Sequence, residues 1–571
     1  MTDQRNMLLA IVLSVLVLLG WTAVSDKYFP TAQEPTVKVE KGKTVATAQP
    51  GADPAVDTPA ALRNREIVLG ETPRVAIETP RLSGSINLKG ARIDDLLLTT
   101  QTETLADDSG PIRLLSPSGA SGAYFANFGW TGQGLALPAP DTVWQASGTR
   151  LTQATPVTLS WDNGGGQRFV IRLSVDDGYM FTAEQTVENR SGAPIAARPY
   201  SLINRSTKSA DASSWTSHVG PVGVFNGSAN YDWDYETVAE EGQQLFSTTG
   251  GWLGFGDKYW LTAVIPAQSG GAEAAFRPTP GGGFQADITP ESTIVGPGSA
   301  SRYTSRLFAG AKEIRLLDRY TDAGIARFDK AIDWGWFEWF MKPIFALLNF
   351  LFDVTRNFGV AIILLVVIVR LLLFPIAQKQ FASMAGMRVV QPKMKELQER
   401  YKDDRAKLQQ EMLKLYKEEK VNPLAGCLPI LIQIPIFYAL YKVLMVAVEM
   451  RHQPFALWIK DLAAPDPMTP VNLFGFLPFT PPSFLAIGVL PILVGITQYL
   501  SFKLNPPPTD PVQRQVFGLM PWILMFIMAP FAAGLQLYWA TNNILTILQQ
   551  KWLYSRHPGM KAAAAAEKAA K

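Results

Sequence analysis

Hydrophobic and polar positions divide this chain of 571 residues into three parts. Residues 7–24 are almost wholly apolar. Residues 63–312 contain short apolar or alternating runs separated by Gly, Pro, Asn and Asp, and long apolar runs return after residue 335. Alternation is typical of half-buried strands, whereas an apolar run of about 20 residues can cross a bilayer as a helix. The pattern therefore predicts a mixed membrane protein with an α-helical transmembrane bundle and an all-β domain.

The long apolar runs predict six transmembrane spans. They lie at residues 7–24, 358–374, 424–447, 484–502 and 516–550. The last run is too long for one span, and a tight turn at Pro530 and Gly534 is expected to divide it into two. Residues 1–25 are interpreted as a retained signal anchor. A removable signal peptide is the alternative, with Ala23-Val24-Ser25 as a poor cleavage site.

Loop charges orient these spans, because Lys and Arg are concentrated on the cytoplasmic side of a membrane protein. Residues 379–420 contain 11 Lys or Arg against 7 Asp or Glu, and the tail at residues 556–571 is also basic. The loop at residues 448–483 has more acidic than basic side chains and is expected outside. Both termini are therefore expected in the cytoplasm, with the region between the first two spans on the outer side.

Composition divides that outer region. Residues 26–62 are rich in Pro, Ala, Thr, Gln and Val and predict a flexible linker. Residues 63–333 predict a β-sandwich. Its strands are expected in the runs 84–98, 169–175, 181–187 and 303–309. Residues 334–357, dense in Trp and Phe at helical spacing, predict an amphipathic helix along the outer membrane interface; a helix that caps the sandwich is the alternative.

The composition argues against covalent chemistry. The single cysteine, Cys427, excludes an intrachain disulfide, and the three histidines are scattered, so no catalytic group, metal site or cofactor is expected. The chain is not expected to be an enzyme. Its net charge of +3 is too small to indicate nucleic-acid binding by the whole chain.

Trp215, Trp233 and Trp252 are candidates for exposed residues of a ligand groove, although core or rim positions are the commoner outcome.

Arg370 is the most informative residue, because it lies inside the second expected span. It is eight residues, or about 12 Å, from the cytoplasmic end at Gln378. Arginine at the centre of a span costs about 2.5–3.5 kcal/mol, and none of the six expected spans contains Asp or Glu to offset that cost. Because arginine keeps its charge, we expect a wet, positive groove that opens to the cytoplasm. The alternative is that Arg370 snorkels to the headgroups.

Polar residues of the other spans are candidates for the lining of this groove. They include Gln433 in the third span and Tyr538 and Asn543 in the last. The missing carboxylate argues against an ion-coupled transporter, which usually keeps an acidic residue in the membrane. A transporter of small anions would be expected to contain inverted repeats, and a carbohydrate-acting enzyme built on the sandwich would need paired carboxylates.

Residues 378–420, between the second and third spans, predict a cytoplasmic hairpin of two amphipathic helices. The turn is expected at Lys402-Asp403-Asp404-Arg405. Met384, Met387 and Met394 recur at helical spacing before that turn. They are interpreted either as an adaptable surface for hydrophobic substrate segments or as part of the seam between the two helices.

Several ordered motifs resemble those of the YidC/Oxa/Albino family of membrane insertases, in its Gram-negative bacterial form. They are Phe358 to Pro375, Met384-Ala385-Gly386-Met387-Arg388, Lys420-Val421-Asn422-Pro423-Leu424, Gln433-Ile434-Pro435-Ile436-Phe437 and Pro454-Phe455-Ala456-Leu457-Trp458-Ile459. The resemblance extends almost continuously over residues 358–554. Two positions depart from the family pattern, because Val366 stands where Thr is usual and Trp539 where a second Tyr is usual.

The resemblance implies an insertase and chaperone of the bacterial inner membrane, with a core of five spans at residues 358–555 and a periplasmic β-supersandwich. Arg370 is then the groove arginine, Tyr538 and Trp539 contact substrate, and the third and fifth spans, with a bend at Pro435, form an apolar slide toward lipid. The implied partners are nascent inner-membrane proteins, the Sec translocon and its accessory subunits, the ribosome, the signal-recognition targeting machinery and the bilayer. No cofactor is implied, and no nucleic-acid role beyond ribosome contact.

Overall fold

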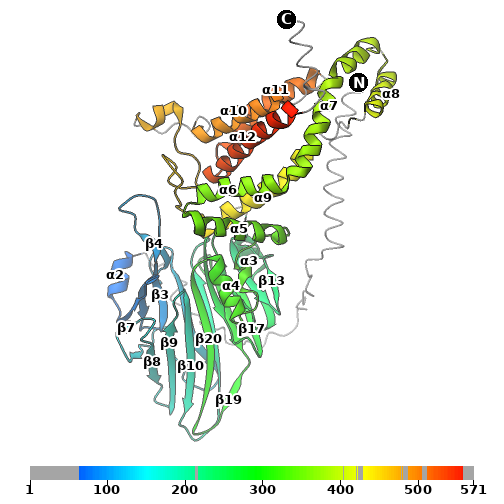
Figure 1. Ribbon diagram of the computed structural model, residues 1–571. Coiled ribbons are helices and arrows are strands. Elements are labelled where there is room, and N and C mark those ends of the chain that lie inside the picture. The colour runs from blue at the N-terminus through cyan, green and yellow to red at the C-terminus, as the bar shows by residue number, and fades with distance from the viewer. Residues whose placement is uncertain are drawn as a thin grey trace.

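A computed structural model of the chain describes residues 63–211, 217–402, 404–419, 421, 428–477, 479, 486–504 and 511–556. The expected signal anchor and linker, Trp215, Cys427 and the tail beyond Arg556 lie outside these residues. Figure 1 shows a β-domain at one end, a group of helices beside it, and a pair of helices that projects away from both.

Two sheets form the β-domain. The 11-stranded sheet has the order β14-β17-β18-β11-β5-β3-β2-β1-β7, with β19 paired to β11 and β4 paired to β3. The nine-stranded sheet has the order β13-β12-β15-β16-β20-β10-β9-β8-β6. Strands β1 and β7 are parallel, and the other paired strands are antiparallel.

The expected runs 169–175, 181–187 and 303–309 each lie within one strand, whereas the run 84–98 is divided between β2 and β3 by a turn at residues 88–91. The first sheet contains β1 (Arg74–Glu78), β2 (Leu82–Asn87), β3 (Arg92–Thr102), β4 (Pro111–Leu115), β5 (Tyr124–Gly132), β7 (Arg150–Leu151), β11 (Ile195–Arg205), β14 (Gln244–Thr249), β17 (Gly271–Thr279), β18 (Gly283–Pro290) and β19 (Thr293–Val295). The second contains β6 (Gln145–Ala146), β8 (Val157–Asp162), β9 (Gln167–Val175), β10 (Met180–Asn189), β12 (Gly220–Phe225), β13 (Ser228–Asn230), β15 (Trp252–Gly256), β16 (Trp260–Ile265) and β20 (Ser299–Ala311).

Alternation in β9 illustrates how the sequence builds the core. Phe169, Ile171, Leu173 and Val175 are buried, and the residues between them are more exposed. In the neighbouring strand β10, Val187 lies opposite Phe169. Such period-two burial transfers one face of each strand from water to the interior, at about 25 cal/mol per Å² of apolar surface. The prediction of a large all-β domain is therefore confirmed.

Trp252 occupies a core position, which the sequence analysis gave as a commoner outcome than a ligand groove. This side chain is 1% exposed, and its ring packs edge-on against Phe328 with the centroids 5.3 Å apart. Strand β15 is enclosed because β12 and β16 flank it and the 3-10 helix η1 (Phe328–Ala331) covers it. Trp233 is half-buried, with its ring centroid 6.4 Å from that of Phe246.

Short helices close the β-domain. They are α2 (Arg65–Gly70), α3 (Tyr235–Glu241) and α4 (Ile314–Asp322). Asp234 caps α3, since its carboxylate accepts a hydrogen bond from the Thr237 N–H at 2.7 Å. Helix α4 differs, because its N-cap residue Glu313 makes no capping bond with its side chain.

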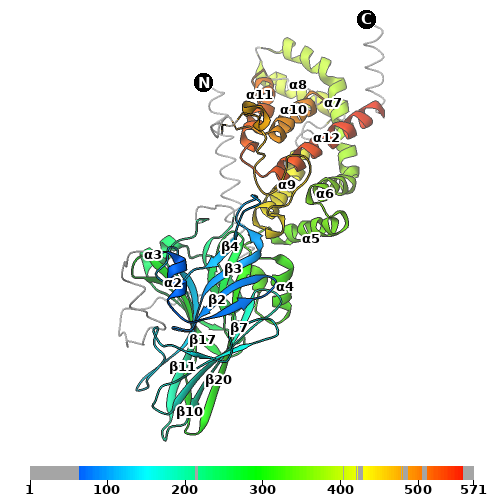
Figure 2. The same cartoon turned by 90° about the vertical axis from the view of Figure 1, so that its left-hand side faces the viewer.

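The helical part begins with α5 (Glu338–Thr355), which lies between the β-domain and the other helices in Figure 2. Trp336 and Trp339 at its start are 69% and 70% exposed, whereas Met341 and Leu348 are buried. The helices that follow are α6 (Phe358–Leu372), α7 (Phe374–Arg400), α8 (Arg405–Glu418), α9 (Leu428–Val446), α10 (Val489–Leu504), α11 (Pro511–Met528) and α12 (Ala533–Arg556). Two 3-10 helices, η3 (Val448–Met450) and η4 (Pro470–Gly475), lie between α9 and α10.

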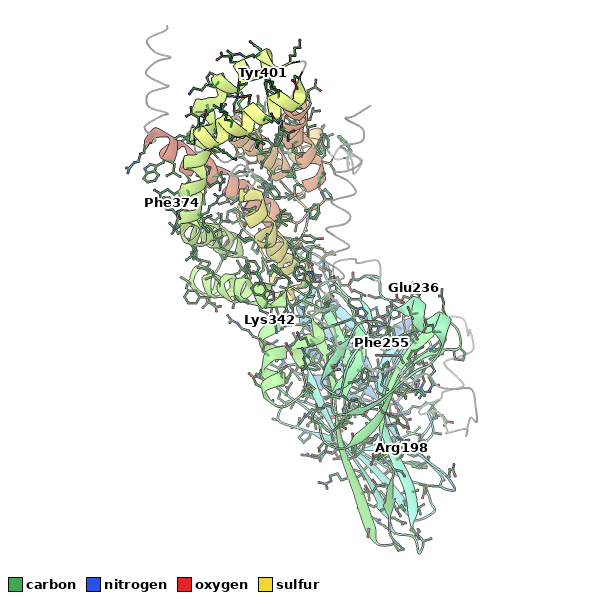
Figure 3. All side chains as sticks on the ribbon, turned by 90° about the vertical axis from the view of Figure 1, so that its right-hand side faces the viewer. Arg198, Glu236, Phe255, Lys342, Phe374 and Tyr401 are labelled. Atoms are coloured by element: carbon green, nitrogen blue, oxygen red, sulfur yellow. The ribbon has the colours of Figure 1, made fainter. Side chains whose placement is uncertain are left out.

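Helices α7 and α8 form the projecting pair. Figure 3 places Tyr401 at the far end of this pair and Phe374 where α7 leaves the bundle, while Lys342 lies near the junction with the β-domain. The expected turn at residues 402–405 therefore joins two helices.

The described helices do not confirm six spans. None of them is by itself both long and apolar enough to cross a membrane. Residues Phe358–Leu372 and Phe374–Phe381 pass that test only together, and they are bent by 64° at the break between them. Three further apolar helices, Gln433–Val446, Val489–Leu504 and Arg514–Met528, are shorter. The expected division of residues 516–550 is seen, because α11 ends at Met528 and α12 begins at Ala533.

Candidate functional site

Arg370 lies near the end of α6, and its half-buried side chain reaches α12. Its Nε and Nη2 atoms donate to the side-chain oxygen of Asn542 at 3.0 and 2.7 Å. Nη2 also donates to the Asn542 carbonyl at 3.2 Å and to the Thr546 hydroxyl. Nη1 donates to Gln549 Oε1 at 3.3 Å. The whole guanidinium fork is therefore held by one helix.

All of these acceptors are uncharged. Amide, hydroxyl and carbonyl dipoles can solvate a guanidinium, but they cannot cancel its charge. Within the described residues, no carboxylate is among the hydrogen-bond partners of Arg370. Its positive charge is thus oriented but not neutralised, which agrees with the absence of Asp and Glu from the apolar runs.

One face of α12 forms this site. Tyr538, Asn542, Thr546 and Gln549 follow at steps of three or four residues and so share a face of the helix. At the N-terminal end of that face, the Tyr538 hydroxyl accepts a hydrogen bond from Gln433 Nε2 of α9. Tyr538 is 2% exposed. Helices α6, α9 and α12 therefore meet along one polar stripe, which we call the arginine stripe.

A second polar face of α12 points to α10. Trp539 Nε1 donates to Gln498 Oε1 at 3.0 Å, and Asn543 Nδ2 donates to the Thr497 hydroxyl at 3.1 Å. The Trp539 ring also contacts Phe437 of α9 edge-on, with the centroids 4.8 Å apart. These bonds join α10 to α12 through residues other than those that bind Arg370.

The structure thus separates the predicted groove residues. Gln433 and Tyr538 lie on the arginine stripe, whereas Trp539 and Asn543 bond to α10. Sequence reasoning missed Thr546 and Gln549 as partners of Arg370. The signal was present, because Asn542, Thr546 and Gln549 are spaced as i, i+4 and i+7 on a helix.

Pro435 is half-buried inside α9, beside Ile434, which is 56% exposed. Helix α11 also exposes large apolar side chains: Val516, Phe517, Leu519, Met520, Trp522, Ile523, Phe526 and Ile527. In the described part of the chain, the surfaces of α9 and α11 therefore include partly exposed apolar side chains.

The hairpin methionines have different surroundings. Met394 is buried with Val390, Leu415 and Val421, and Met387 packs against the same cluster. Both therefore contribute to the seam between α7 and α8. The side chain of Met384 lies outside the described part of the structure. A role for these residues in substrate contact stays a prediction.

Comparison with known proteins accounts for both parts of the molecule. The family described as the 60Kd inner membrane protein matches residues 350–561, and the family described as the YidC periplasmic domain matches residues 74–347. The chain is 49% identical over 559 residues to the membrane protein insertase YidC of Zymomonas mobilis subsp. mobilis, covering 97% of this chain and 96% of the relative. It is 44% identical over 597 residues to the YidC insertase of Methylorubrum extorquens, covering 98% and 96%.

A solved structure of an active YidC insertase with its first transmembrane domain resolved is also similar. It is 20% identical to this chain, with a TM-score of 0.37, and the match covers 84% of this chain and 92% of that one. The two family matches adjoin, so the chain is an inner-membrane protein with a periplasmic domain. It belongs to the YidC family of membrane protein insertases.

Proposed function

We propose that the arginine stripe receives the polar flank of a nascent inner-membrane protein while the apolar segment of that substrate leaves along α9 and α11 into lipid. The observation that supports this most is the uncompensated charge of Arg370. A cation held only by neutral dipoles still attracts an acidic residue, and does so more strongly at low local dielectric than in bulk water. The step involves no covalent chemistry.

Hydrophobic transfer supplies the driving force in this proposal. A substrate segment that moves from water to lipid gains about 25 cal/mol per Å² of apolar surface. The exposed apolar residues of α9 and α11 provide a surface along which the segment moves. The stripe lowers the barrier for the short polar flank, which would otherwise cross hydrocarbon unsolvated.

The proposed topology is the one that the apolar runs and loop charges predict, and the proposed partners are those that the family resemblance implies. The chain has six spans, both termini in the cytoplasm and the β-domain in the periplasm. It acts alone or with the Sec translocon, and the α7–α8 hairpin and the basic tail meet the ribosome and the targeting machinery.

The test replaces Arg370 with Ala in the full chain, reconstituted in vesicles with a single-span substrate whose translocated tail contains either two Asp or two Asn. We expect Arg370→Ala to lower insertion of the acidic tail about tenfold, the effect of roughly 1.4 kcal/mol, and to leave the neutral tail within about twofold. Arg370→Lys should keep the preference for the acidic tail, because the charge remains.

The Asn-tailed substrate is the matched control for expression and folding of the variant. Equal insertion of the acidic tail by wild type and Arg370→Ala would remove the electrostatic account. An equal loss for both tails would instead assign Arg370 to the packing of α6 against α12.

A further inference from the structure

The outer end of α9 is attached to the β-domain by charged side chains of the segment that follows the helix. Glu449, in η3, accepts a hydrogen bond from the Ile314 N–H at 2.7 Å. Arg451 donates from Nη1 to the Thr102 carbonyl at 2.7 Å and from Nη2 to the Glu103 carbonyl at 3.1 Å. These bonds join positions more than 130 residues apart in sequence. We call Glu449 and Arg451 the junction pair.

Glu449 caps a helix to which it does not belong. The first N–H groups of any α-helix lack partners within that helix. In α4 the N-cap residue Glu313 leaves them uncapped, because its own carboxylate accepts hydrogen bonds from Arg81 at 2.7 and 2.8 Å and from Tyr179 at 2.8 Å. The Glu449 carboxylate supplies the missing acceptor from the segment after α9.

Arg451 binds the other side of the junction. It chelates two successive carbonyls at the end of β3, and its guanidinium carbon lies 5.6 Å from the centre of the Trp260 ring. The neighbouring His452 ring nitrogen lies 3.3 Å from the Thr102 hydroxyl. Within α9 itself, Lys442 Nζ lies 3.8 Å from the Asp333 carboxylate. The contacts therefore fix α9 from several segments of the β-domain.

We propose that Glu449 and Arg451 are positioning residues, through which the β-domain braces the outer end of α9 and so sets the place of Gln433 on the arginine stripe. Gln433 and Val446 are 13 residues apart on that helix, about 20 Å at 1.5 Å per residue. A change in tilt at the outer end therefore displaces the stripe. The effect on insertion rests on the proposed function, whereas the brace itself does not.

The junction also has a pH signature. The charged groups that face Glu449 are Glu313 and Arg315, both at the start of α4, and burial raises the pKa of Glu449 to about 7. Its Oε2 atom is buried and has no hydrogen-bond partner among the described residues. An acid whose pKa is higher when docked than when released binds more protons in the docked state. Docking should therefore strengthen as the pH falls from about 7 toward the ordinary glutamate value.

The experiment measures docking without substrate. The full chain with Cys427→Ser carries one spin label at Leu105→Cys, in the β3–β4 connection, and one at Leu457→Cys, in the loop after η3. The distribution of the distance between the two labels is narrow for docked protein and broad for released protein, so it gives the ratio of the two. Both leucines are exposed. In the wild type we expect the ratio of docked to released protein to rise at least tenfold between pH 8 and pH 5.

Three variants make the outcome decisive. Glu449→Gln keeps the acceptor and cannot ionise, so it should stay docked at both pH values. Glu449→Ala removes the cap and should lower the docked ratio about fivefold, the usual effect of one lost cap, and it should reduce insertion of acidic and neutral tails alike. Glu241→Gln, at an exposed carboxylate of α3, is the matched control and should match the wild type.

A wild-type distribution that does not respond to pH would overturn the assignment of the pH dependence to Glu449. Equal widths for Glu449→Gln and Glu449→Ala would overturn the brace. If the docked ratio depends on Glu449 while Arg370→Ala inserts acidic tails normally, the brace stands and the proposed function of the arginine stripe is wrong.

Discussion

The β-domain and the helical bundle give half-buried arginines different kinds of partner: carboxylates in the β-domain and neutral groups in the bundle. In the β-domain, Arg277 donates to Asp287 at 2.7 and 3.3 Å, Arg205 lies 2.9 Å from Asp257, and Arg74 pairs with Asp94. In the bundle, the partners of Arg370 among the described residues are amide, hydroxyl and carbonyl groups. A paired arginine has its charge satisfied within the fold. An unpaired one retains an attraction for an acidic group that arrives from outside.

The difference predicts that arginine removal has different consequences in the two regions. In the β-domain the variant leaves a carboxylate buried without its partner, which costs stability. In the bundle the variant leaves only neutral acceptors, which polar neighbours or water can satisfy at lower cost. Stability should therefore depend mainly on the β-domain arginines, and function on Arg370.

The largest effect is expected for Arg277→Ala. Asp287 has a side chain 2% exposed, and burial already raises the pKa of its carboxyl, although Arg277 acts to lower it. Without Arg277 the β-domain should lose about 3–5 kcal/mol of unfolding free energy at pH 7. The urea midpoint of the detergent-solubilised full chain, followed by tryptophan fluorescence, measures this loss.

The pH dependence sharpens that prediction. Loss of Arg277 raises the pKa of folded Asp287 further above its unfolded value, so the folded variant prefers the protonated acid. Stability that depends on this proton is present at acid pH and is lost as the pH rises. The deficit should therefore shrink toward pH 4. The control is Arg277→Met with Asp287→Leu, which should recover most of the stability; a deficit that is equally large in this double variant would reject the pairing argument.

An intermediate effect is expected from two adjacent asparagines of α12. Asn542 binds Arg370, whereas Asn543 binds Thr497 on the second polar face of the helix. Asn542→Leu should free the guanidinium from one acceptor and reduce insertion of acidic tails about threefold to tenfold, as expected for the loss of a charge-assisted bond of roughly 1 kcal/mol. Asn543→Leu should weaken the packing of α10 on α12 without any dependence on tail charge. Vesicle insertion of the Asp- and Asn-tailed substrates separates the two, and identical profiles would contradict the assignment of the faces.

These two residues also mark the limit of what the sequence predicts. Hydrophobic periodicity predicts the strands, the helices and the turn before α12, because each depends on a local pattern. Arg370 can be identified from the local sequence alone, because it is an isolated charge in an apolar run. The partner of Arg370 does not follow in this way, since successive helical residues point about 100° apart and only the packing of α6 against α12 selects Asn542 over Asn543. The choice between a groove position and a core position for Trp252 depends on packing in the same way, because distant segments enclose this residue.

The smallest effect is expected for Arg319→Ala. Arg319 binds Asp177 through two nitrogens, at 3.0 and 2.8 Å, distances similar to those between Arg277 and Asp287. The Arg319 hydrogen bond also holds the pKa of Asp177 below its ordinary value. However, the two side chains are 50% and 68% exposed, so water replaces the lost partner and the unfolding free energy should fall by no more than about 0.5 kcal/mol.

The Arg319 variant shows whether the loss of unfolding free energy expected for Arg277→Ala comes from the geometry of the ion pair or from its burial. Because the folded pKa of Asp177 is lowered, its small contribution should be present at pH 7 and disappear as the pH falls below the ordinary aspartate value. Added salt should diminish it as well, since exposed charges are screened. If the urea midpoint of Arg319→Ala shifted as far as that of Arg277→Ala, burial would not distinguish the pairs, and the contrast between a satisfied and an available arginine would lose its physical basis.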